Sequence, residues 1–557
     1  MCVVTSLELF PIGWRDVWQD SEEQKSVGAV FTKPAIVNLI LDLAGYNPNE
    51  SRLVDRTLME PSCGDGAFLH GAISRLIESE RTHVGKVDWR QEQLDVAVCA
   101  VDINPRSVDT ARVLVSRLLG EAGCPNTRAT ALSQKWVIQT DFLLEQWDRR
   151  FDFVVGNPPY VRIEDLPKQV LKRYRSEFST LSDRADLYIA FFEQGLRLLS
   201  SCGTLAYITA NRFAKNTYGA GLRKLVSDTY RVRYYVNLEH TQPFLTDVSA
   251  YPAIVVIDRE KGGATRAGTL ADVETDTLSI VRRQAFGRAG KVIEHFGTWF
   301  PNGEPWATTS GKEHALLSRL SATLPSLEES SSGTKVGIGV ATGADRVFVL
   351  KEKHADIEES RQLPLLMASN VNNVQLNWSG RYLVNPFVDE GDGRLVELSN
   401  YPGLGNYLEE HKEAVFRRHV AKARPKAWYR TIDRIWPSLV AQPKLVIPDI
   451  QGSTVIGYDE GHYYPHHNLY WITSDSWPLL ALKTILRSSI VYQQVRAYSV
   501  QMRGGSVRFQ AQTLRRIRLP FLSDVSDPFL ERLAQISGSA NQTEIDDVVA
   551  EVYLRIN

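Results

Sequence analysis

The first 260 residues alternate between short runs of apolar and β-branched residues and longer segments in which apolar residues recur every three to four positions. Runs of the first kind are typical of strands, and segments of the second kind are typical of amphipathic helices. The clearest helical pattern lies at 186–199, where Leu187, Phe191 and Leu198 share one face. The predicted strands are 56–59, 94–101, 136–139, 151–155, 204–210, 232–238 and 253–257. Alternating strands and helices predict an α/β domain with a doubly wound, mostly parallel sheet.

The pattern changes after residue 260. The stretch 261–268 is rich in glycine (KGGATRAG), and we place a linker at 261–270. Residues 271–557 have a less regular period and many Trp, Tyr and Pro residues, and the last thirty residues return to a helical pattern. We therefore expect two domains, 1–260 and 271–557, of which the second is a mixed α+β domain that ends in helices.

Composition narrows the class of protein. The 557 residues are 43% hydrophobic and 23% charged, with a formal net charge of −1, which is ordinary for a globular protein and excludes a histone-like polycation. The five cysteines are scattered and never spaced as C-x-x-C, so we expect no disulfide framework, no zinc ribbon and a reducing compartment. No apolar run approaches 18 residues and the first twenty residues carry charges, so we expect no transmembrane helix, no signal peptide and a cytoplasmic protein.

Positive charge is concentrated in the second half of the chain. The stretches 414–432 and 476–523 contain no acidic residue, and the second holds eight Lys and Arg residues, including Arg503 and Arg508. A solvated surface is the simplest explanation of one such stretch. Two of them, both with interleaved aromatic residues, favour a polyanionic partner.

A glycine-containing loop follows the first predicted strand, with the sequence MEPSCGDGAFL at 59–69. Gly64 and Gly66 would allow the backbone to approach a ligand closely. The loop is not G-x-G-x-x-G and no Lys-Ser/Thr follows, so a nucleotide phosphate is not implied. Glu60, at the end of the strand, is instead suited to a cationic group.

Two further acids follow predicted strands. Asp102 comes directly after one strand, where a carboxylate can bind both hydroxyls of a ribose, and Asp141 follows the next. Each alone is consistent with a turn or a helix cap. Ligands of such sheets bind at the carboxyl ends of the strands, so three acids at successive strand ends predict a ligand site.

The tetrapeptide Asn157-Pro158-Pro159-Tyr160 directly follows the fourth predicted strand. A rigid turn capped by Asn157 would explain it structurally. It also suits methylation of an exocyclic amine, whose lone pair is delocalised into a base. The Asn157 side-chain oxygen and the Pro158 carbonyl can accept its two hydrogens and direct the lone pair at a methyl sulfonium, while Tyr160 offers a stacking face. Such catalysis rests on positioning and electrostatics.

Other chemistry finds little support. His462, His466 and His467 lie close in sequence, but no cysteine is near and the spacing matches no zinc pattern, so we expect no metal site. No G-x-S-x-G elbow occurs, so a serine hydrolase of that type is not supported.

Together, Thr32 in VFTKP, the Glu60 loop, Asp102, the Asp141–Phe142 pair and Asn157–Tyr160 resemble the gamma-class N6-adenine DNA methyltransferases of bacterial type II restriction–modification systems. The resemblance extends to the segments GTLAYITANRF and PFLTD and covers the catalytic half of the chain. It implies a seven-stranded methyltransferase fold that binds S-adenosylmethionine, followed by a DNA target-recognition domain.

The resemblance also implies roles for individual residues. The cofactor residues would be Thr32 and Glu60 at the methionine end, Asp102 at the ribose, Asp141 and Phe142 at the adenine, and Gly64 and Gly66 in the loop. Asn157 and Pro158 would bind the target N6, and Tyr160 and Phe244 would sandwich the flipped base. Arg503 and Arg508 would contact DNA.

Several alternatives remain. Glutamine methyltransferases acting on release factors and RNA guanine methyltransferases share Asn-Pro-Pro-Tyr, but neither requires about 290 further residues. N4-cytosine DNA methylation uses the same physics, and a non-catalytic DNA-recognition subunit would retain the fold; a fused nuclease is disfavoured. On the main hypothesis the protein is a bacterial, nucleoid-associated monomer that acts on double-stranded DNA and is paired functionally with a cognate restriction endonuclease.

Overall fold

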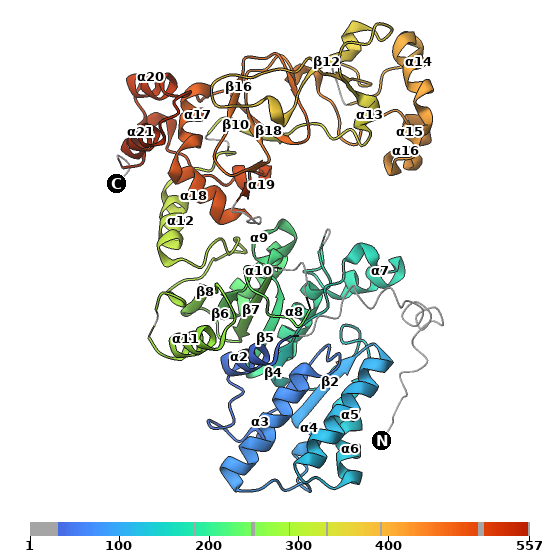
Figure 1. Cartoon of the computed structure of the whole chain (residues 1–557), viewed down its shortest axis with the longest axis vertical. Helices are drawn as coiled ribbons and strands as arrows, with labels where there is room; N and C mark the ends of the chain where they lie inside the picture. The colour runs from blue at the N-terminus through green and yellow to red at the C-terminus, as the bar shows by residue number, and fades with distance from the viewer. Residues whose placement is uncertain are drawn as a thin grey trace. The chain divides into compact units, whose positions relative to one another are not determined.

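The computed structural model describes residues 32–182, 185–246, 251–288, 290–329, 332–389, 393–499 and 506–554. These residues form two compact units, the first ending at Lys312 and the second beginning at Glu313 (Figure 1). Within the described ranges, no helix is both long and apolar enough to cross a membrane.

The first unit is built on a nine-stranded sheet with the order β3-β2-β1-β4-β5-β7-β6-β8-β9. The five strands from β3 to β5 run parallel, whereas β7 is antiparallel to both of its neighbours. The strands are β1 (Leu58–Glu60), β2 (Val98–Asp102), β3 (Val137–Gln139), β4 (Phe151–Gly156), β5 (Leu199–Ala210), β6 (Arg231–Asn237), β7 (Pro252–Asp258), β8 (Thr265–Thr269) and β9 (Glu294–Phe296). The predicted doubly wound, mostly parallel sheet of seven strands is confirmed, and β8 and β9 extend it.

Helices cover both faces of this sheet (Figure 1). Alternate residues of β5 show why, because Ala206 and Ile208 pack into the core shared with α2, α3 and α5, whereas Tyr207 contacts Phe192 of α8. The helices of this unit are α2 (Pro34–Ala44), α3 (Ala67–Val84), α4 (Leu94–Ala97), α5 (Pro105–Glu121), α6 (Asn126–Trp136), α7 (Lys168–Glu177), α8 (Tyr188–Arg197), α9 (Arg212–Lys215), α10 (Ala220–Thr229) and α11 (Thr275–Phe286). Helix α12 (Gly311–Thr323) begins at the end of the first unit and lies mostly in the second.

Two predicted segments differ from the structure. The first half of the predicted strand 94–101 is the helical turn α4, which buries Leu94 and Ala97. The predicted linker 261–270 contains β8, which pairs in parallel with β6. Gly262 and Gly263 both have positive φ, so the glycines turn the chain back to the sheet rather than leading it away.

The second unit is a mixed α+β structure that ends in helices, as predicted. It contains the four-stranded sheets β10-β18-β14-β16 and β11-β13-β12-β17 and the pair β15-β19. The strands are β10 (Thr334–Ile338), β11 (Val349–Leu350), β12 (Gln362–Leu366), β13 (Tyr382–Val384), β14 (Lys444–Pro448), β15 (Ile450–Gln451), β16 (Gly457–Asp459), β17 (Tyr464–Pro465), β18 (Leu469–Ser474) and β19 (Val507–Arg508). The helices are α13 (Asp345–Phe348), α14 (Pro402–Glu410), α15 (Lys412–Phe416), α16 (His419–Ala423), α17 (Leu479–Arg487), α18 (Ser489–Tyr498), α19 (Ala511–Leu514), α20 (Asp527–Gln535) and α21 (Gln542–Leu554).

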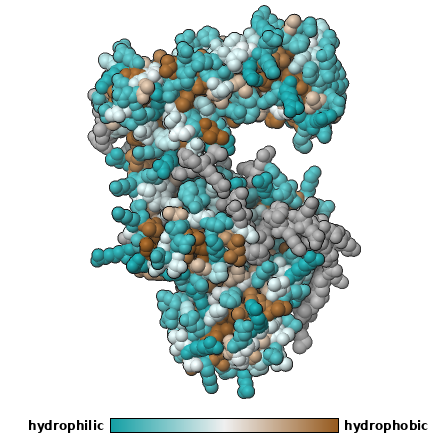
Figure 2. All heavy atoms as spheres, viewed as in Figure 1, coloured by the Kyte–Doolittle hydropathy of each residue, from teal (hydrophilic) through white to brown (hydrophobic). Residues whose placement is uncertain are grey.

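The first four-stranded sheet and the C-terminal helices share one core, in which Leu445 and Ile472 from the strands join Leu482 of α17 and Val549 of α21. A second core surrounds β12, β13 and α14. The visible faces of both units are mostly hydrophilic, with scattered apolar patches (Figure 2). Most apolar side chains of the two units are therefore packed in their cores.

Candidate functional site

The predicted site residues lie at one edge of the first sheet. Glu60 and Asp102 end β1 and β2, Asp141 follows β3 by two residues, and Asn157 directly follows β4. Because these four strands are parallel neighbours, their carboxyl ends meet at the same edge. The sequence therefore located the acids and the tetrapeptide on the same side of the fold.

The loop after β1 is held against the end of β2. The Cys63 N–H donates to the Val101 carbonyl (2.9 Å), and the Gly64 N–H donates to Asp102 Oδ2 (2.9 Å). Gly64 and Gly66 have φ of 49° and 90°, so both occupy the left-handed region that favours glycine. A Cβ at Gly66 would lie 2.5 Å from Leu114 Cδ2, so this turn also needs the absence of a side chain.

Burial dominates the electrostatics of the three acids. Glu60 is 1% exposed, and its Oε2 has no hydrogen-bond partner among the described residues. Burial, and then the neighbouring Asp102, raise the pKa of Glu60 well above its usual value. Burial also raises the pKa of Asp102, although its carboxylate accepts N–H bonds from Gly64 and Asn104 (2.9 and 2.8 Å). Such a cluster favours a cationic ligand.

Asp141 is oriented by a partner that the sequence did not suggest. Its Oδ2 accepts a hydrogen bond from the Tyr174 hydroxyl (2.8 Å), and its Oδ1 accepts one from the Leu143 N–H (2.9 Å). Burial raises the pKa of Asp141, and Tyr174 opposes that shift. Tyr174 shares the buried face of α7 with Val170, a spacing that indicates only core packing.

Thr32 and Phe244, 212 residues apart in the chain, are joined by an isolated antiparallel bridge, with the Lys33 N–H donating to the Pro243 carbonyl (2.9 Å). Both side chains are buried, and Thr32 Oγ1 has no hydrogen-bond partner within the described ranges. The segment before α2 is thus fixed beside the predicted base-binding phenylalanine.

The tetrapeptide is tied to the glycine loop. The Ser62 hydroxyl donates to the Asn157 carbonyl (3.2 Å), a contact for which the sequence carried no signal. Tyr160 packs edge to face against Phe244 (centroids 6.5 Å apart, 71°) and Tyr188 (6.4 Å, 69°). The Tyr188 and Tyr218 hydroxyls lie 2.9 Å apart, and the Tyr218 hydroxyl donates to Asp186 (3.3 Å). Aromatic side chains therefore pack around Tyr160 of this loop.

Three aromatic residues that were predicted to contact the cofactor or the base are not arranged for stacking on a ligand. Phe142 is 2% exposed and stacks on Phe191 of α8 (5.4 Å, 25°), so its ring is largely committed to the interior. Tyr160 and Phe244 lie edge to face rather than parallel. A base enclosed between them requires one of the two rings to turn.

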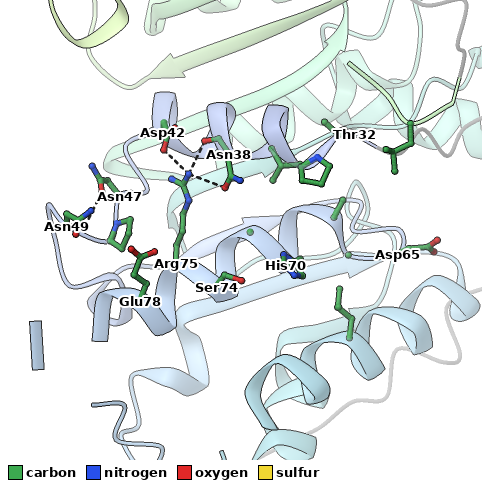
Figure 3. Close-up of a pocket in the computed structure, with 18 residues that line it drawn as sticks. Thr32, Asn38, Asp42, Asn47, Asn49, Asp65, His70, Ser74, Arg75 and Glu78 are labelled. Carbon is green, nitrogen blue, oxygen red and sulfur yellow. Dashed lines mark hydrogen bonds and ion pairs between the residues drawn. The ribbon is translucent and has the colours of Figure 1, made fainter. Parts of the chain in front are cut away.

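A groove of about 630 Å³ borders this edge between α2 and α3. Figure 3 shows Thr32 and Asp65 toward one end and Asn47, Asn49 and Glu78 toward the other. Arg75 bridges its walls through Asp42 (2.7 Å) and Asn38. Gly66 also lines the groove, but Glu60, Asp102 and Asp141 do not, so the groove adjoins the acids without containing them.

The two basic stretches of the second unit differ in the exposure and pairing of their side chains. In the stretch 476–523, Lys483 and Arg487 are buried and donate to backbone carbonyls, and Arg508 is paired with Asp449. Arg503 lies outside the described residues. In the stretch 414–432, Lys422, Arg424 and Lys426 are exposed. This second group, which we call the basic surface, is the better candidate for contact with a polyanion.

Comparison with known proteins identifies the family. A family model described as Eco57I restriction-modification methylase matches residues 97–244. The type II methyltransferase M.PaeR7I of Pseudomonas aeruginosa is 42% identical over 530 residues, which is 94% of this chain and 91% of that protein. The type II methyltransferase M.XhoI of Xanthomonas vasicola is 41% identical and covers 94% and 97% of the two chains. The chain belongs to the type II methyltransferases.

Solved structures agree on the fold of this methyltransferase. The type IIL restriction-modification enzyme MmeI, solved in complex with DNA, has a TM-score of 0.61 at 14% identity and covers 94% of this chain and 74% of its own. The type ISP enzyme LlaGI, solved with a DNA substrate mimic, has a TM-score of 0.55 at 12% identity and covers 91% and 46%. The predicted methyltransferase fold with its second α+β domain is confirmed.

We expect Gly66→Ala to destabilise the methyltransferase more than Gly64→Ala. Both substitutions force alanine to a positive φ, at a cost of about 1–2 kcal/mol. Only the Cβ at position 66 also meets Leu114, which adds roughly 1–3 kcal/mol of overpacking. Urea unfolding of the two variants measures the difference. Equal losses of stability would show that Leu114 moves away without cost.

Proposed function

We propose that this type II methyltransferase transfers a methyl group from S-adenosylmethionine to N6 of an adenine flipped out of duplex DNA. The observation that carries the proposal is the position of Asn157-Pro158-Pro159-Tyr160. The tetrapeptide directly follows β4, at the sheet edge where Glu60, Asp102 and Asp141 gather. This edge is where doubly wound folds bind their ligands.

The residues present fit S-adenosylmethionine. Thr32 Oγ1 and Glu60 Oε2 are buried polar atoms without a hydrogen-bond partner in the described structure, so both are available to a ligand. Glu60 would bind the cationic methionine end with Thr32, Asp102 the ribose, and Asp141 the adenine amine, with Tyr174 as a positioning residue that fixes the Asp141 carboxylate. When bound, the cofactor supplies an electrophilic methyl group on a sulfonium.

The chain's own residues would activate the amine by position. The Asn157 side-chain oxygen and the Pro158 carbonyl accept the two N6 hydrogens, which turns the nitrogen lone pair toward the methyl group. Pro158 and Pro159 restrict the backbone so that this carbonyl keeps its direction. The bond from Ser62 to the Asn157 carbonyl links this loop to the loop that adjoins the cofactor residues. No tuned histidine is required.

Extruding a base from the duplex costs a few kcal/mol. Stacking on an aromatic side chain contributes roughly 1–3 kcal/mol per base, so Tyr160 can offset much of that cost. Because Phe244 now lies edge to face with Tyr160, it would complete a sandwich only after its ring turns. Base binding thus replaces the contact between the two rings with two stacking contacts.

The partners follow from the same proposal. Double-stranded DNA is the substrate, a cognate restriction endonuclease is the functional counterpart, and the enzyme acts as a monomer. The two solved neighbours are restriction-modification enzymes bound to DNA or a DNA mimic, which supports the substrate class.

Asn157→Ala should abolish methyl transfer while leaving cofactor binding in place, because the proposal assigns the Asn157 side chain to the target amine and not to the cofactor. Purified protein is incubated with duplex DNA and labelled S-adenosylmethionine, and the DNA is digested to nucleosides. We expect N6-methyladenine with the wild type and at least a 100-fold slower rate with the variant. N4-methylcytosine would overturn the choice of base, and cofactor binding without transfer would indicate a recognition subunit.

Near the raised pKa of Glu60, binding of S-adenosylmethionine should release up to one proton from the Glu60 carboxyl. The raised pKa favours the protonated carboxyl in the free protein, whereas a bound cation favours the carboxylate. Affinity should therefore increase as pH rises through that raised pKa. Calorimetry in buffers of different ionisation enthalpy counts the protons, and Glu60→Gln should remove the release. Unchanged release in that variant would assign the protons to another group.

Replacing Lys422, Arg424 and Lys426 together with alanine should weaken DNA binding uniformly across sequences. Removing three phosphate contacts should reduce the slope of log K against log salt by roughly 2–3. Arg532→Ala is the control, since Arg532 on α20 pairs with Glu551. Fluorescence anisotropy at several salt concentrations measures both effects. An unchanged slope would remove the basic surface from the interface.

A further inference from the structure

Three side chains that commonly ligate metals converge in the second unit: Asp345, His466 and His467. One ligand atom from each lies within 4.8 Å of the other two. His466 Nε2 is 3.1 Å from Asp345 Oδ2 and 3.1 Å from His467 Nδ1. His466 is 2% exposed, whereas the Asp345 side chain is 46% exposed. The cluster is therefore anchored in the interior and open to solvent on the side of Asp345.

The backbone holds these residues together independently of any ligand. Asp345 begins α13, and His466 and His467 follow β17. Val340 and His466 form a parallel bridge, and the His467 N–H donates to the Val340 carbonyl (3.0 Å). The Thr342 hydroxyl donates to Asp345 Oδ1 (2.5 Å), which fixes the carboxylate. The three ligand groups are thus preorganised.

Hydrogen bonding alone does not satisfy this arrangement. A single N–H on His466 Nε2 cannot point at both Asp345 Oδ2 and His467 Nδ1. If Nε2 carries no proton, its lone pair faces a carboxylate oxygen. Three electron-pair donors around one point are better neutralised by a cation than by one shared proton.

We propose that Asp345, His466 and His467 bind one divalent metal ion of the zinc class. Imidazole nitrogen and carboxylate oxygen bind such ions at about 2.0–2.2 Å, so neighbouring ligand atoms lie roughly 3.0–3.5 Å apart. The two separations of 3.1 Å fall in this range. Three protein ligands and an exposed carboxylate leave at least one coordination position to solvent.

Protonation is compatible with this site. Burial, and then the neighbouring His467, lower the pKa of His466, which favours the neutral imidazole that ligates metals. The ion would tie the segment 340–346 to the start of β18 and so stabilise the second unit. This proposal does not depend on which base the enzyme methylates.

The sequence predicts no metal site because no cysteine lies near His462, His466 and His467 and their spacing, with Asp459 and Glu460 just upstream, matches no zinc pattern. His462 is exposed and lies beside Asp459, whose carboxylate pairs with Lys444 (2.8 Å) in a fully buried ion pair. The Asp459 carboxylate is therefore already neutralised by Lys444. The third ligand is instead Asp345, 121 residues before His466, which no local spacing reveals.

The test uses the full chain after dialysis against a chelator. Zn²⁺ is titrated by calorimetry and by thermal unfolding, and Co²⁺ is titrated by its visible absorption. We expect binding of one ion per chain and a higher melting temperature. Asp345→Asn and His467→Ala should each weaken Zn²⁺ binding by roughly 100-fold and lose the thermal shift. His462→Ala should bind as the wild type does.

The variants separate loss of a ligand from loss of the fold. Asp345→Asn keeps the size of the side chain and its hydrogen bond from Thr342, and circular dichroism of each metal-free variant checks its structure. Absence of Zn²⁺ binding by the folded wild type would overturn the proposal. So would Zn²⁺ binding that survives both ligand substitutions, or that is lost in His462→Ala.

Discussion

The structure of the first unit depends on carboxyl groups buried at one edge of a parallel sheet. Burying a carboxylate without a partner is costly, and the pKa values of Glu60, Asp102 and Asp141 are all raised by burial. The surrounding loops donate different numbers of hydrogen bonds to the three carboxyl groups, so the cost of burial is offset to different extents. Asp102 receives two backbone N–H bonds and Asp141 receives Tyr174, whereas Glu60 Oε2 receives none in the described structure. The least compensated acid is the one best suited to attract a cation, so the electrostatic strain is concentrated where the ligand is expected.

The same edge couples the glycine loop after β1 to the tetrapeptide after β4. Ser62 bonds to the Asn157 carbonyl, and a Cβ built at Gly156 would lie 3.5 Å from Pro61 Cδ and 3.7 Å from Glu60 Cγ. The two loops therefore lie next to one another and are joined by a direct hydrogen bond. Methyl transfer needs donor and acceptor aligned to within fractions of an ångström. On the proposed function, the contact between the two loops would contribute to that alignment.

The hydrophobic periodicity and the short motifs of the sequence predicted those features of the structure that depend on residues close together in the chain. All seven expected strands form, and the acids occupy their ends, because strand periodicity and strand ends are local properties. What the sequence did not indicate involves tertiary contacts. Phe142 stacks on Phe191, nearly fifty residues away, and Arg508 is neutralised by Asp449. A count of charges along the chain does not reveal such pairing, which is why the stretch 476–523 is less basic at the surface than its sequence indicates. The contact of Tyr174 with Asp141 could not be predicted from the sequence, because the spacing of Tyr174 from Val170 on α7 indicates only a core residue.

Long-range pairs limit sequence analysis in both units. Thr32 meets Phe244 through one isolated bridge, and Asp345 meets His466 beside another, between Val340 and His466. In each case a short backbone contact between distant segments, rather than a regular strand pair, brings polar groups together. A single bridge contributes little stability on its own, so each such junction needs further interactions to persist. At Thr32 the packing of Phe244 in the core provides them. At Asp345 the core packing of Val340 and Phe348 provides them, and a bound cation would add to that packing.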